Sequence, residues 1–147
     1  MTDEEILKVV KTYPCNFIVL TGGEPALQID DKFIHLLHHE GKNVAIETNG
    51  TRPIPEHLDW VTVSPKCDFC KHAEVVLKKA DEVKIVFPCP NPQRYLTLIS
   101  ATHHYLQPCD TGKEEENKQN LELCISYCLE HPEWSLSLQL HKLIGVK

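Results

Sequence analysis

Short apolar runs, each followed by polar and flexible residues, recur along this 147-residue chain. The first run, residues 17–20, consists of β-branched, aliphatic and aromatic residues, the composition of a strand buried on both faces. Apolar runs at residues 43–48, 60–63 and 83–87 predict three more strands, and residues 96–106 predict a weaker fifth. Residues 134–140 alternate apolar and polar positions, as a half-buried strand does.

Amphipathic helical segments lie between these strands. Thr2 and Glu5 fit a capping box at the start of a helix over residues 3–11, and a second helical face over residues 27–37 ends at Gly41. This order of strand, polar loop and helix predicts an α/β fold with a mostly parallel sheet and right-handed helical crossovers. From residue 113 onward a further helix is predicted by apolar positions at helical spacing, which are Leu121, Cys124, Ile125, Cys128 and Leu129.

The polar loops that follow the strands form the candidate site. The carboxyl ends of parallel strands lie at one edge of the sheet, and open α/β sheets bind ligands at that edge. We therefore expect five segments to converge there, namely residues 21–25, 47–51, 64–66, 107–110 and 139–141.

The first of these loops reads Thr21-Gly22-Gly23-Glu24-Pro25. One interpretation is a plain tight turn. The other is a binding loop, because glycines allow the backbone to approach a ligand and a carboxylate accepts hydrogen bonds from an amine or a ribose but repels phosphate. Neither a Walker A motif nor G-x-G-x-x-G occurs, which argues against an ordinary triphosphate or dinucleotide site.

Three side chains on the other loops could take part in the same site. Glu47 suits ribose hydroxyls or a proton transfer, although it could equally cap the next helix. Lys66 could bind a carboxylate group. His141 could hydrogen-bond a heterocycle, but a single histidine is more often structural.

Composition limits the classes of function. The length predicts one domain, residues 1–147, and the formal net charge of −6 gives no sign of a nucleic-acid surface. No apolar run approaches the roughly 20 residues that a membrane helix needs, and the acidic N-terminus does not read as a signal peptide. We expect a cytoplasmic protein with no membrane partner.

Seven cysteines are scattered without the pattern of a secreted disulfide framework, so we expect reduced thiols. Cys15, Cys124 and Cys128 read as small buried hydrophobic residues. Cys67 and Cys70, with His72, have the spacing of half a zinc or iron-sulfur site. No second C-x-x-C completes the set, so these cysteines are only a weak metal candidate.

The motifs together resemble the 7-carboxy-7-deazaguanine synthases, a family of radical S-adenosylmethionine enzymes of queuosine and 7-deazapurine biosynthesis. The matching segments occur in the family's order and span nearly the whole chain. GGEP-like loops are common among radical S-adenosylmethionine enzymes, whereas the Ser-Pro-Lys and Ser-Leu-Gln-x-His-Lys motifs are more specific. The segments that match the family are residues 21–25, 47–51, 59–66, 107–110 and 137–142.

The resemblance implies a partial (β/α) barrel and a role for each loop. S-adenosylmethionine would be held by Gly22, Gly23, Glu24, Ser64, Pro65, Lys66, Gln107, Pro108, Cys109 and Asp110. The pterin substrate, 6-carboxy-5,6,7,8-tetrahydropterin, would face Thr21, Glu47, His141 and Lys147, with Glu47 and His141 as candidate catalytic residues. The implied reaction is a radical ring contraction that gives 7-carboxy-7-deazaguanine and releases ammonia, assisted by Mg²⁺.

One departure from the family pattern concerns the 4Fe-4S cluster. The resemblance places its three-cysteine motif upstream of the helix that opens this chain. We therefore expect the chain to be the C-terminal two-thirds of such a synthase, and inactive by itself. Two alternatives are a non-enzymatic S-adenosylmethionine-binding module and a small zinc protein using Cys67 and Cys70. An uncovered sheet edge predicts a homodimer or a larger assembly, and the resemblance implies a homodimer as well.

Overall fold

A computed structural model of the chain describes residues 2–66, 68–71 and 73–145. Six parallel strands form one sheet in the order β1-β2-β3-β4-β5-β6. The prediction of an α/β fold with a mostly parallel, partly closed barrel is confirmed. The strands are β1 (Phe17–Leu20), β2 (Asn43–Thr48), β3 (Trp60–Val63), β4 (Glu82–Phe87), β5 (His103–Pro108) and β6 (Ser135–Leu136).

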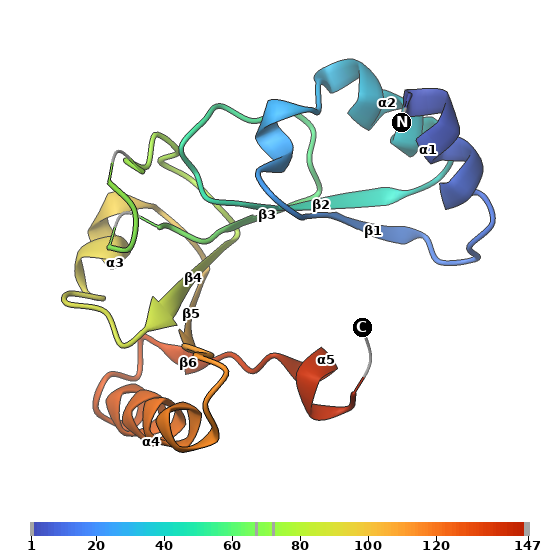
Figure 1. The fold of residues 1–147 in the computed structure, drawn as a ribbon. Coiled ribbons are helices and arrows are strands. Elements are labelled where there is room, and N and C mark those ends of the chain that lie inside the picture. Colours follow the sequence, from blue (N-terminus) through green and yellow to red (C-terminus); the bar gives the residue numbers. More distant parts are fainter. Residues whose placement is uncertain (1, 67, 72, 146–147) are drawn as a thin grey trace.

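Figure 1 shows the sheet bent into an arc, with helices on its outer side and its concave side open. No helix among the described residues is both long and apolar enough to cross a bilayer. The helices are α1 (Asp3–Val10), α2 (Asp31–His39), α3 (Arg94–Leu98), α4 (Glu114–Glu130) and α5 (Leu140–Leu143), with a short 3₁₀ helix at Pro25–Leu27.

Helix starts follow from local hydrogen bonding. The Thr2 hydroxyl accepts from the Glu5 backbone N–H at 3.3 Å and the Glu5 carboxylate accepts from the Thr2 N–H at 2.8 Å, so the predicted capping box is present at α1. Asp30 caps α2 by accepting from the Phe33 N–H at 2.9 Å. These caps fix where the helices begin beside the sheet.

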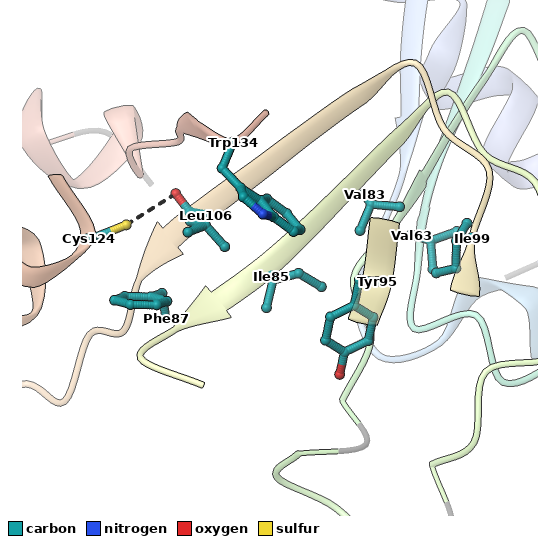
Figure 2. Packing of buried hydrophobic residues seen from close by; sticks show 9 residues of the cluster. All are labelled: Val63, Val83, Ile85, Phe87, Tyr95, Ile99, Leu106, Cys124 and Trp134. Atoms are coloured by element: carbon teal, nitrogen blue, oxygen red, sulfur yellow. Dashed lines mark hydrogen bonds between the residues drawn. The ribbon is translucent and has the colours of Figure 1, made fainter. Parts of the chain in front are cut away.

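The core lies between the sheet and the helices. On β4 the odd-numbered residues Val83, Ile85 and Phe87 are buried against the helices. Figure 2 shows them with Tyr95 of α3 and other buried side chains of the cluster. Since strand residues alternate between faces, the even-numbered residues of β4 face the concave side. A second cluster packs α2 against β2.

The prediction of a weaker fifth strand over residues 96–106 is wrong in its first half. Residues Arg94–Leu98 form α3, and strand β5 spans His103–Pro108. Tyr95 of α3 and Ile99, the extended residue that follows the helix, are both fully buried. A short apolar run does not distinguish a helix from a strand by its periodicity.

The last strand, predicted over residues 134–140, is also too long. Only Ser135–Leu136 pair with β5, and the chain then turns into α5. The apolar alternation continues past the residues that pair with β5. Leu138 and Leu140 are therefore not buried, and they are 41% and 63% exposed.

Some apolar positions are more exposed than predicted. Phe17 and Val19 are 52% and 45% exposed, so β1 is not buried on both faces; it is an edge strand whose concave face is uncovered. On α4, Cys124 is buried as predicted, but Leu129 is 80% exposed. Cys15, which we expected to be buried, is exposed.

Candidate functional site

A cleft of about 720 Å³ lies on the concave side of the sheet, at the carboxyl ends of the strands. Its volume is in the range of small-molecule sites. Each of the five predicted loops contributes to its lining, so their convergence is confirmed. The lining residues are Val19, Thr21, Gly22, Gly23, Glu47, Thr48, Asn49, Ser64, Lys66, Lys84, Gln107, Ser137, Leu138, Gln139 and His141.

The Gly-Gly segment of the first loop brings backbone to the cleft wall. Gly22 and Gly23 have φ angles of +89° and +59°, a left-handed conformation that favours glycine. No atom lies within 4 Å of a Cβ built on either residue, and both residues are exposed.

Glu24 ties this loop to the end of β2. One carboxylate oxygen accepts from the Thr48 hydroxyl at 2.6 Å and from the Ala26 N–H at 3.1 Å, and the other accepts from the Asn49 N–H at 2.7 Å. Glu24 is not among the cleft-lining residues. In this structure its carboxylate fixes the loop, and contact with a ligand amine would use the lone pairs that remain on its oxygens.

Glu47 enters the cleft from the end of β2 and meets a residue that our sequence analysis missed. The Lys84 ammonium, on β4, donates to Glu47 Oε1 at 2.7 Å. The available signal was the alternation of β4, where Lys84 stands between the buried Val83 and Ile85 and therefore faces the opposite side.

The Ser-Pro-Lys segment after β3 supplies a second cation. The Lys66 ammonium donates to the Ser64 hydroxyl at 2.8 Å, and both residues line the cleft. Burial lowers the pKa of Lys66, and the positive charge of Lys84 lowers it further. Pro65, predicted to touch the cofactor, is fully buried and is not among the lining residues.

The segment that follows Lys66 is anchored to α3. The Asp68 carboxylate accepts from Arg94 Nη2 and from the Tyr95 hydroxyl, both at 2.7 Å. Tyr95 is fully buried, so this contact joins the loop to the core. Among the described residues no group of three or more His, Cys, Asp or Glu side chains could hold a metal ion. Cys70 is exposed, while Cys67 and His72 lie outside the described residues.

The two C-terminal motifs divide between two cavities. Gln107 and His141 line the cleft, whereas Pro108, Cys109 and Asp110 line a separate cavity of about 280 Å³ next to α4 and α5. Asp110 is paired with Lys142, and this contact is the main cause that lowers the pKa of Asp110 to about 2. Lys147, a predicted substrate residue, lies outside the described residues.

Comparisons with known proteins agree on one family. The family model of the radical SAM superfamily matches residues 1–128. The chain is 46% identical over 147 residues to the 7-carboxy-7-deazaguanine synthase of Bacteroides thetaiotaomicron, of which it spans 74%. It is 45% identical over 131 residues to the enzyme of the same name from Caulobacter vibrioides, of which it spans 59%.

A solved structure supports the same assignment. The crystal structure of QueE from Escherichia coli matches with a TM-score of 0.71 at 27% identity, over 95% of this chain and 64% of that chain. The chain therefore belongs to the radical SAM superfamily and, within it, to the family of the 7-carboxy-7-deazaguanine synthases.

Proposed function

We propose that this chain binds S-adenosylmethionine and 6-carboxy-5,6,7,8-tetrahydropterin in its cleft and serves the ring contraction to 7-carboxy-7-deazaguanine. The observation that carries this proposal is the convergence of the five motif loops on one cavity of about 720 Å³. A cavity of that size suits two small ligands that must meet.

The cofactor end of the cleft fits S-adenosylmethionine. Gly22 and Gly23 offer exposed backbone groups to its methionyl end. Ser64 and Lys66 offer a hydroxyl and an ammonium, the donors that a carboxylate needs. When bound, S-adenosylmethionine would supply the radical chemistry of the superfamily. The small cavity next to Asp110 is separate from the cleft, although Leu138 and Gln139 line both.

The substrate end is built from Thr21, Glu47 and His141. A pterin ring carries amide and amine N–H groups, and a carboxylate accepts hydrogen bonds from such groups. Glu47 is the carboxylate among the cleft-lining residues. His141 is exposed and lines the cleft, and we propose that it contacts the ring or moves a proton.

The superfamily uses a 4Fe-4S cluster, and the described residues do not fit one. They contain no group of three ligating side chains, and the printed sequence has no C-x-x-x-C-x-x-C pattern. We infer that the 147 residues provide the binding half of the site, and that turnover needs cluster ligands from outside them.

Binding measurements on the 147-residue chain test the proposal. Calorimetry with S-adenosylmethionine and fluorescence titration with 6-carboxypterin, an oxidised analogue of the substrate, should both show binding. Glu47→Gln should weaken 6-carboxypterin binding by about ten-fold, since a hydrogen bond to a charged group is lost. Glu122→Gln, on the exposed part of α4, is the matched control and should bind both ligands normally.

Absence of binding for both ligands at millimolar concentration would contradict the proposed function. Turnover is tested after anaerobic treatment with iron, sulfide and a reductant, with the Bacteroides relative as the positive control. We expect 7-carboxy-7-deazaguanine from the relative and none from this chain. Product from this chain would show that the cluster inference is wrong.

A further inference from the structure

The concave face of the sheet carries a row of polar side chains below the loops. The strand register places Glu47 of β2 next to Thr62 of β3, and Thr62 next to Glu82 of β4. Lys84 follows Glu82 on the same face, because alternate strand residues share a face. Lys84 and Glu47 are therefore separated by one whole strand.

Lys84 closes that separation by reaching across β3. Its ammonium meets Glu47 Oε1 at 2.7 Å, while its side chain is only 17% exposed. The residue beneath this contact is small: Thr62 is buried, and its hydroxyl accepts from the Trp60 indole N–H at 3.1 Å. A larger side chain at Thr62 would stand in the way of the ion pair.

The two carboxylate oxygens of Glu47 differ in their contacts. Oε2 makes no hydrogen bond with any described residue, and the Glu47 side chain is 42% exposed at the cleft. A flexible glutamate loses rotamer entropy when a ligand fixes it. A partner that already holds one oxygen removes that cost before the ligand arrives.

Resting on the proposed function, we propose that Lys84 is a positioning residue, which holds Glu47 across β3 so that its free oxygen receives the N–H groups of the pterin. Lys84 itself touches Glu47 and not the reacting atoms. The charge of Lys84 lowers the pKa of Lys66, and it opposes the rise that burial causes in the pKa of Glu82.

The first test needs no ligand. In a ¹⁵N spectrum of lysine ammonium groups, the Lys84 signal is identified by its loss in Lys84→Met. Glu47→Gln should shift this signal or broaden it by faster proton exchange, because the ion pair is broken. An unchanged Lys84 signal in Glu47→Gln would overturn the inference, whatever the protein binds.

The second test separates positioning from general structure. Lys84→Met should weaken 6-carboxypterin binding by about ten-fold, as Glu47→Gln does. The affinity of the double variant should be no lower than that of the single variant that binds more weakly. Lys84→Arg, which keeps the charge, should recover most of the affinity. Affinity for S-adenosylmethionine should change by less than about two-fold, and Lys118→Met on α4 should leave both affinities unchanged.

Normal 6-carboxypterin binding by Lys84→Met, or losses that multiply in the double variant, would overturn the proposal. If the unmodified chain binds no 6-carboxypterin, the proposed function fails. The ammonium spectrum then still decides whether Lys84 holds Glu47.

Discussion

Tyr95→Phe tests the anchor that joins the Ser-Pro-Lys loop to the core. The Tyr95 hydroxyl donates to Asp68 Oδ2 at 2.7 Å, and the Tyr95 ring, on α3, is fully buried (Figure 2). Phenylalanine keeps the ring, so the change removes the hydroxyl, which also accepts from Arg94 Nη2 at 2.7 Å, and little packing. A hydrogen bond to a charged group contributes about 1.5–3 kcal/mol to stability.

The lower end of that range applies here. Asp68 retains the Arg94 guanidinium on its other oxygen at 2.7 Å, so its charge is not left unpaired. The Asp68 side chain is 9% exposed, so water replaces the hydroxyl poorly. We expect the free energy of unfolding to fall by about 1.5–2 kcal/mol.

Urea unfolding at 25 °C measures this change, with an unaltered m-value as the sign that the two end states are unchanged. Tyr127→Phe is the matched control, because the Tyr127 hydroxyl makes no hydrogen bond with a described residue while its ring stacks on His131. A loss in Tyr95→Phe no larger than that in Tyr127→Phe would refute the anchor.

Three further predictions concern a turn, a surface ion pair and the sheet edge. Gly50→Ala should destabilise the chain by about 1–3 kcal/mol in urea, because its Cβ would lie 2.7 Å from Val63 Cγ1. Gly41→Ala, with a similar φ but open space, should cost less; equal losses would contradict the clash. In an NMR titration, Lys142→Met should raise the pKa of Asp110 from about 2 toward 3.8. The stability that this depressed pKa contributes is present above pH 3.8 and is lost as the pH falls toward 2, so the variant should show less of this acid dependence. We also propose a homodimer that covers β1, and a monomer in light scattering would contradict it.

The sequence was informative where local composition decides structure. Residues 43–48 and 83–87 are apolar runs of strand length, and both form strands that start or end within a residue of the prediction. The loops after the strands could be placed at one edge because parallel strands end together. The α3 helix was missed because it is five residues long and buries a single side chain, Tyr95.

The side-chain contacts of the site depend on sheet register, which the sequence does not display. Lys84 reaches Glu47 because β3 lies between β2 and β4 with Thr62 at the crossing. Glu24 was expected to face a ligand, yet its carboxylate bonds to Thr48 and Asn49, which are more than twenty residues away along the chain.

A ¹H–¹⁵N spectrum of the chain titrated with S-adenosylmethionine tests most directly whether these loops bind the cofactor. We expect the largest shift changes at the backbone amides of Gly22, Gly23, Asn49 and Ser64, which line the cleft. Amides on the exposed side of α4 should stay in place. No change at millimolar ligand, or changes concentrated away from the cleft, would contradict the claim that these loops form the cofactor site.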